Sequence, residues 1–191
     1  MRYLYFLYIL VTSFSSFAYS VECGITANFK GIPQITKNTY QLTEQVSLFT
    51  KSYLNYQSKS NARMATNITC QLLSGSQYSG TQKEWQHLID TNIKQLADSG
   101  FSSLTFTAVI GDAKKYTGSL INREYIIEAV KDKRKQIFYI VNILSRQKST
   151  VYSVMVSADN SIVNEVEAEF VRVLSTLKIP KEQEQEQEQE S

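Results

Sequence analysis

The side chains that could do chemistry in this chain are few, and they form no catalytic motif. The single histidine, His87, has no serine or cysteine motif beside it, and the sequence has no G-x-S-x-G, H-E-x-x-H, C-x-x-C or glycine-rich phosphate loop. Glu165, Glu167 and Glu169 are an acidic cluster, which we interpret as a solvated helix start rather than a metal site. We therefore expect no catalytic residue, no metal and no cofactor, and a hydrolase with an unrecognised site is the least favoured alternative.

Cys23 and Cys70 are the only cysteines. In an oxidising compartment such a pair favours a disulfide, which would tether the N-terminal arm and stabilise the fold by at most about 4 kcal/mol. The alternative is two unpaired, buried thiols. Two sulfurs and His87 cannot complete a tetrahedral metal site by themselves.

Residues 1–20 have the pattern of a secretory signal peptide. Arg2 provides a positive start, Tyr3 to Val11 is apolar, and Ala18-Tyr19-Ser20 resembles a cleavage site. An uncleaved N-terminal anchor is the alternative. No later stretch approaches the ~18 apolar residues that a bilayer crossing needs. We therefore expect an exported protein, periplasmic or secreted, without a transmembrane segment in the mature chain.

The charge of the chain argues against a nucleic-acid partner. Residues 21–180 contain 18 basic and 13 acidic residues, a net charge of +5, which is well short of a dense basic stripe. Residues 181–191 are a Glu/Gln repeat with no apolar side chain, and this composition predicts a disordered tail.

Two groups of residues are candidates for an interaction surface. Tyrosines in the N-terminal half suit recognition because each combines an apolar ring with a hydroxyl, and a basic turn could attract an acidic partner. The candidates are Tyr40, Tyr53, Tyr56 and Tyr78, with Lys131, Lys133, Arg134 and Lys135. The alternatives are half-buried strand tyrosines and a charged turn that keeps a hairpin solvated and blocks edge pairing.

Elements of the second half are the clearest. A capping box at Thr81 to Glu84 predicts a helix that ends at Gly100. A strand should follow at 101–110, and then a three-stranded meander between Ser119 and Ala158. A second amphipathic helix should run from Asp159 to Pro180. In the first meander strand we expect the following sides: Ile121, Tyr125, Ile127 and Ala129 inward, and Asn122, Glu124 and Glu128 outward.

The N-terminal half is harder to interpret. Short strands are expected at 23–29, 40–42, 46–49 and 66–73, with a polar loop at 55–63. Together these elements predict one α+β domain over residues 21–180, in which an antiparallel sheet carries two amphipathic helices.

Residues 81–179 resemble the PsbP-like α/β/α sandwich superfamily. The resemblance rests on the first helix, on the paired strands KQIFYIVNIL and STVYSVMVSA, and on the segment from Glu169 to Ile179, which looks like the closing F-x-x-x-L-x-S-(F/L)-K of that family. It implies a binding or assembly protein rather than an enzyme. It covers about half of the chain, leaves the cysteine pair unmatched and transfers no functional residue.

The leading hypothesis is an exported, non-catalytic binding or assembly protein that recognises a protein partner, such as an inhibitor or accessory factor of an envelope system. The alternative is a binder of a small molecule or envelope lipid in a sheet–helix cleft near Tyr125, Tyr139 and Tyr152. The sequence leaves the partner and the oligomeric state open.

Overall fold

The computed structural model describes residues 23–59, 62–147 and 149–180. The expected signal peptide (1–20) and the Glu/Gln tail (181–191) lie outside the described residues, so both stay predictions. No helix in the described ranges is long and apolar enough to cross a membrane.

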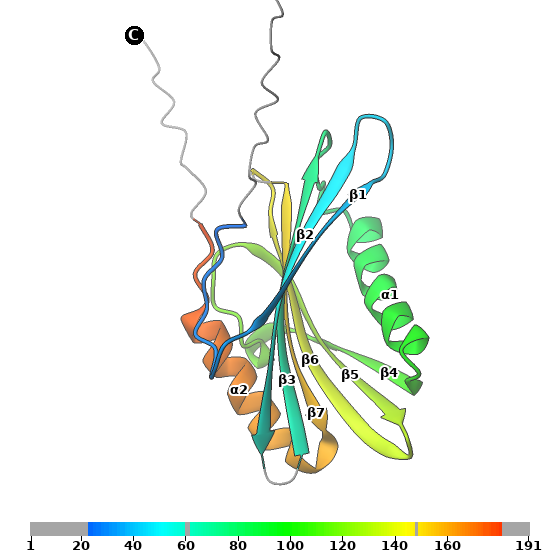
Figure 1. Ribbon diagram of the computed structural model, residues 1–191, viewed down its shortest axis with the longest axis vertical. Coiled ribbons are helices and arrows are strands. Elements are labelled where there is room, and N and C mark those ends of the chain that lie inside the picture. The colour runs from blue at the N-terminus through cyan, green and yellow to red at the C-terminus, as the bar shows by residue number, and fades with distance from the viewer. Residues whose placement is uncertain (1–22, 60–61, 148, 181–191) are drawn as a thin grey trace, which may run out of the picture.

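The described residues form a seven-stranded antiparallel sheet in the order β1-β2-β3-β7-β6-β5-β4 (Figure 1). Its strands are β1 (Gln34–Gln41), β2 (Ser47–Lys59), β3 (Ala62–Ser74), β4 (Ser102–Val109), β5 (Ile121–Lys131), β6 (Arg134–Ser145) and β7 (Thr150–Asp159). Short 3-10 helices are η1 (Gly111–Ala113) and η2 (Asn160–Ile162). The N-terminal strands therefore extend the meander into one continuous sheet.

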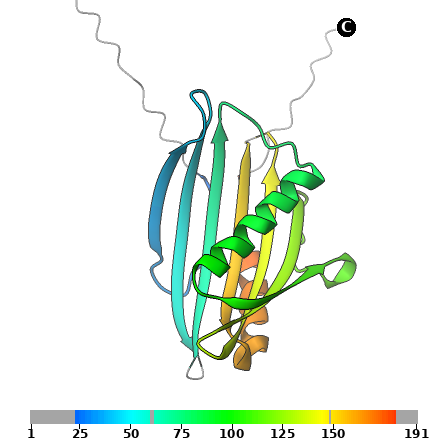
Figure 2. The same ribbon diagram turned by 90° about the vertical axis from the view of Figure 1, so that its right-hand side faces the viewer.

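Helices α1 (Gln82–Asp98) and α2 (Val163–Thr176) cover opposite faces of this sheet (Figure 2). Alternation along the strands explains the arrangement, because odd-numbered residues of β6 such as Val141 pack with α2 and even-numbered ones such as Phe138 and Ile140 form the core under α1. Both faces of β6 are thus buried from Ile137 onward, whereas β7 is buried on its α2 side and mostly half-buried on its α1 side. The predicted α+β sandwich is confirmed.

The start of α1 follows the predicted capping box with one difference. The Thr81 hydroxyl accepts a hydrogen bond from the backbone of Glu84, as expected. The Glu84 carboxylate, however, accepts from the N–H of Gly80 at 2.6 Å, one residue earlier than in the standard motif. Gly100, with φ of +86°, follows the helix in the left-handed conformation that the sequence predicted.

Two expectations for the N-terminal half are wrong. The predicted loop at 55–63 is the end of β2 and the start of β3, which pair continuously through Lys59 and Ala62. The predicted strand at 23–29 is an extended arm that forms a single bridge, Thr26 to Lys178. The polar strand residues were misleading because many of them lie on the part of the sheet that no helix covers.

In β5 two side chains differ from the prediction in their burial, although each lies on the expected face of the strand. Glu124 was expected to face solvent but is buried, because the segment before β5 folds over it and the N–H groups of Lys115 and Tyr116 donate to its carboxylate at 3.0 and 3.2 Å. Ile121 was expected inside and is exposed, since it lies at the first position of the strand.

Candidate binding site

The four candidate tyrosines do not form one surface. Tyr40 and Tyr56 are exposed on the α1 side of the sheet, but near opposite ends of the β1–β2 hairpin. Tyr53 lies on the α2 side, where its ring stacks with Phe29 at 6.2 Å. Tyr78 packs against the core of Trp85, Leu144 and Val151, and its burial, with the nearby Glu84 carboxylate, raises its pKa to about 12. These positions leave Tyr40 and Tyr56 as the exposed members of the group.

The basic turn divides into one structural residue and three exposed ones. Lys131 donates to the carbonyl of Ser99 at 2.9 Å and lies 4.9 Å from the Phe101 ring centroid, so it fastens the end of α1 to β5. The exposed members are Lys133, Arg134 and Lys135. Their role as an interaction surface stays a prediction.

The tyrosines of the predicted sheet–helix cleft are interior residues. Tyr125, Tyr139 and Tyr152 are all buried, and the hydroxyl of Tyr125 accepts from Asn92 and Asn142 beneath α1. The Tyr125 hydroxyl therefore pairs with interior amide groups, and all three rings are part of the packed interior instead of lining an open cleft between sheet and helix.

Strand β1 is an exposed edge of the sheet. All eight of its residues are exposed, and in the described part of the chain it pairs with β2 alone. The pairing runs without interruption from Gln34 opposite Leu54 to Gln41 opposite Ser47. Lys37 is its one charged residue. An edge of this kind presents a row of backbone N–H and C=O groups to another strand.

The other edge of the sheet is constructed differently. The pairing of β4 with β5 shifts register between Ser102 and Thr105, and Ser103 has a φ of +52°. Such a bulge twists an edge strand and hinders the addition of a further strand. Of the two edges, β1 is therefore the better template.

The outward-facing backbone groups of β1 can be assigned. The N–H of Leu42 donates to the carbonyl of Val46 at 2.9 Å. Hydrogen-bonded and non-bonded pairs alternate in an antiparallel ladder, so the even-numbered residues of β1, like Leu42, are bonded to β2. The odd-numbered residues therefore point their N–H and C=O away from β2. The outward-facing residues are Ile35, Lys37, Thr39 and Gln41.

Exposed apolar side chains gather around this edge. Ile35 and Tyr40 lie in β1, Ile32 lies just before it as a residue that is 95% exposed, and Leu42 follows it. Exposed apolar residues grouped in this way often mark an interaction site. The edge thus combines unpaired backbone groups with apolar contacts on both sides.

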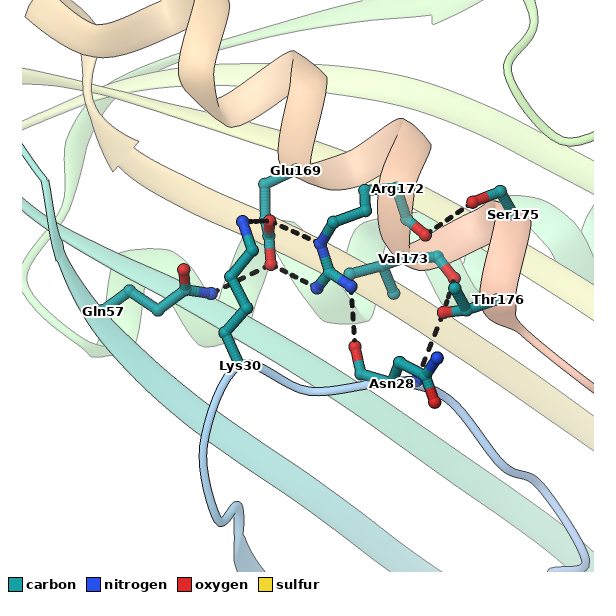
Figure 3. Close-up of polar contacts among 8 residues, drawn as sticks. All are labelled: Asn28, Lys30, Gln57, Glu169, Arg172, Val173, Ser175 and Thr176. Carbon is teal, nitrogen blue, oxygen red and sulfur yellow. Dashed lines mark hydrogen bonds and ion pairs between the residues drawn. The ribbon is translucent and has the colours of Figure 1, made fainter.

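An N-terminal arm, residues 23–33, lies along α2 and is held by a polar cluster around Glu169 (Figure 3). The buried Glu169 carboxylate accepts from Lys30 Nζ at 2.7 Å, from Gln57 Nε2 at 2.9 Å and from Arg172 Nη2 at 2.6 Å. Arg172 also donates to the carbonyl of Asn28 at 2.9 Å. The cluster joins the arm, β2 and α2.

Glu169 corrects the interpretation of the acidic cluster as solvated. Burial opposes ionisation of this carboxyl, but the hydrogen bonds from Arg172, Lys30 and Gln57 outweigh it and lower its pKa to about 2. The sequence did contain a signal, because Glu169 is three residues from Val166 and four from Val173, on the apolar stripe of the helix.

The predicted disulfide is present and fastens the other end of the arm. Cys23 and Cys70 are bonded, with their α-carbons 6.1 Å apart, and both are buried. The arm is thus attached to the body at Cys23 and at Lys30. Within the described ranges, no group of three or more His, Cys, Asp and Glu side chains could hold a metal ion.

No protein-family model matches the chain, and no curated protein matches it either. A structure of PA94, a Pseudomonas aeruginosa protein of unknown function suggested to be a regulator, aligns with a TM-score of 0.43 and 10% identity, over 80% of this chain and 100% of that one. LpqN, involved in cell envelope biogenesis of Mycobacterium tuberculosis, aligns with a TM-score of 0.42 and 12% identity, over 81% of this chain and 90% of that one. Likeness at this level carries no argument, so the PsbP-like resemblance stays a prediction.

Proposed function

We propose that this protein is an exported, non-catalytic binding protein that takes an extended segment of a protein partner onto the free edge of β1. The observation that carries the proposal is the uninterrupted eight-residue edge, exposed at every position. Export is supported by the Cys23–Cys70 disulfide, because such bonds persist in oxidising compartments.

The partner segment would add an eighth strand through the backbone groups of β1. Ile35, Lys37 and Thr39 would each offer one N–H and one C=O to it, which gives affinity with little dependence on sequence. Selectivity would come from the side chains on the two sides of the new strand. Ile35 and Tyr40 favour an apolar residue opposite them, and Lys37 favours an acidic one.

Proteins usually protect an edge strand with a bulge, a proline or several charges. β4 has its bulge, whereas β1 has a single lysine and a regular ladder. Pro33 precedes the strand and leaves its eight residues able to pair. The difference between the two edges supports a role for β1 in recognition.

The test uses Lys37→Pro with Lys37→Thr as the matched control. Proline removes an outward N–H and leaves the hydrogen bonds to β2, while threonine keeps the N–H and removes the same charge. The unmodified protein and the two variants are each screened with a displayed library of unstructured peptides. We expect peptides that bind the unmodified protein and the threonine variant but not the proline variant.

Hydrogen exchange then locates the contact. Peptide binding should slow exchange of the Lys37 and Thr39 amides, while the Asn38 amide, already bonded to β2, changes little. Binding that survives Lys37→Pro, or protection confined to another surface, would contradict the proposal. Circular dichroism and thermal unfolding verify that the variants are folded.

A further inference from the structure

Beneath the N-terminal arm is a cleft of about 450 Å³ on the α2 side of the sheet. Its floor is the directly paired residues Tyr53 and Ile68, and Phe29 from the arm stacks with the Tyr53 ring. Ile25 and Pro33 complete a largely apolar lining. The size and lining are those of a site for one small molecule.

A polar pair lies next to this floor. Asn55 and Thr66 face each other two residues beyond Tyr53 and Ile68, on the same side of the sheet. Asn55 Oδ1 and Thr66 Oγ1 are buried and make no hydrogen bond within the described residues, although the two side chains are only 5% and 1% exposed. Gly31, which lines the cleft, lies against Asn55, since a Cβ at Gly31 would be 3.4 Å from the Asn55 amide nitrogen.

Buried polar atoms almost always have a partner, so this pair is an unusual feature. A ligand hydroxyl in the cleft could donate to Asn55 and accept from Thr66, because the amide oxygen is an acceptor and the threonine hydroxyl can do either. Two buried polar atoms without a partner therefore lie next to the apolar floor of the cleft, although neither side chain is part of its lining.

The opposite end of the floor is positively charged. Lys51 Nζ lies 5.1 Å from the Tyr53 ring centroid, and Lys37 of β1 is paired directly with Lys51. Neither β1 nor β2 contains an acidic residue. The Glu169 carboxylate, on the same side of the sheet, is already paired with Lys30 and Arg172. An anionic group near Lys51 would thus be attracted by its charge, and no acidic residue of β1 or β2 would compete.

We infer that the cleft binds an anionic amphiphile: a linear apolar chain with a carboxylate at the Lys51 end and a hydroxyl at the Asn55–Thr66 end. Four residues of strand separate Lys51 from Asn55, roughly 13 Å, which is the span of an extended chain of about ten carbons. The chain lies over Ile68 and beside the stacked rings of Tyr53 and Phe29. This inference does not rest on strand addition to β1.

The N-terminal arm supplies most of the lining of the cleft, and the arm is attached to the body of the protein at its two ends. Ile25 lies two residues after Cys23, and Lys30 is bonded to Glu169. Breaking the disulfide would release the Ile25 side of the cleft while the floor on β2 and β3 stays in place. The binding site is therefore linked to the redox state of Cys23 and Cys70.

The probe is 10-hydroxydecanoate, titrated by calorimetry below its micelle concentration and compared with decanoate and 1,10-decanediol. We expect the hydroxy acid to bind at least tenfold more tightly than either, because one comparator lacks the hydroxyl and the other the charge. Lys51→Gln should lower the affinity for the hydroxy acid at least tenfold. Lys59→Gln, eight residues along the same strand and side, is the matched control and should change nothing.

Two further variants separate the parts of the site. Thr66→Val keeps the shape, so decanoate should bind as before while the preference for the hydroxy acid disappears. Ala27→Leu fills the cleft from the arm and should abolish binding without lowering the melting temperature. The inference is overturned if the hydroxy acid does not bind, if the diol binds equally well, or if Lys51→Gln and Ala27→Leu leave its affinity unchanged. Binding to the β1 edge would be unaffected by Ala27→Leu, which keeps this test distinct from that of strand addition.

Discussion

Lys30 and Glu169 form a 2.7 Å ion pair across 139 positions of sequence. Lys30 is more than half exposed while the Glu169 side chain is almost completely buried, so the pair is anchored on the helix and covered by the arm. An isolated surface pair contributes little to stability, but loss of a partner from a buried one is costly. The contact therefore determines how firmly the arm is held.

The stability of the protein should depend on the ionisation of Glu169. Its pKa is lowered from 4.5 to about 2 in the folded state, so its contribution is complete above about pH 4.5 and is lost as the pH falls towards 2. We expect Glu169→Gln to lower the free energy of unfolding by about 3 kcal/mol at pH 7 and to have little effect near pH 2. Urea unfolding between pH 2 and 7 measures this difference.

Glu165→Gln, one turn earlier on α2, is the control for that experiment and should change stability by less than about 0.5 kcal/mol. A loss for Glu169→Gln that is the same at pH 2 and pH 7 would mean that packing, not charge, accounts for its effect.

Removing the disulfide should loosen the arm more than the sheet. The bond closes a loop across 47 positions, and for Cys23→Ala with Cys70→Ala we expect a loss of about 3–4 kcal/mol. Hydrogen exchange should accelerate first at Thr26, whose N–H donates to the carbonyl of Lys178. Unchanged protection of this amide would show that the rest of the arm is sufficient to hold it.

Two glycines offer a matched pair of substitutions. Gly75 and Gly100 both have positive φ, but a Cβ at Gly75 would lie 1.9 Å from the carbonyl oxygen of Gln45 whereas one at Gly100 has nothing within 4 Å. Gly100→Ala should cost about 1 kcal/mol for the left-handed backbone, and Gly75→Ala clearly more, because the hairpin must move as well. Thermal unfolding of the two variants gives the comparison. Equal losses of stability in the two variants would indicate that the turn at Gln45 can shift at little energetic cost.

The β5–β6 hairpin can be made more stable. Asp132 and Lys133 occupy its two turn positions with φ of +50° and +63°, a conformation that favours Asn-Gly. The double change Asp132→Asn, Lys133→Gly should raise the free energy of unfolding by about 1 kcal/mol, while Lys133→Ala should not. Chemical denaturation distinguishes the two, and a gain for the alanine variant would point to charge instead of backbone geometry.

Helix α1 and the meander could be predicted because their signals are local. The Thr81–Glu84 cap, Gly100 and the alternating apolar residues around Phe138 each determine structure within a few residues. The order of elements and the two-sided burial of β6 follow from these signals alone.

The N-terminal strands and the Glu169 cluster could not be predicted in the same way. Half of β2 and the whole of β1 face solvent on at least one side, so their polar residues gave no apolar alternation, and Asn55 to Lys59 were interpreted as a loop. The partners of Glu169 come from Lys30 and Gln57, more than a hundred positions away. Contacts of that range leave no local pattern in the sequence.

The closeness of Gly24 and Pro180 has a mechanical consequence. A Cβ at Gly24 would be 2.6 Å from Pro180, and two residues inward Thr26 and Lys178 exchange backbone hydrogen bonds. Tension applied between these two points would act first on the short junction of backbone hydrogen bonds between Thr26 and Lys178. A circular permutant that joins residue 180 to residue 23 by a short linker should therefore keep the sheet and both helices, because the new peptide would span a gap that the fold has already closed.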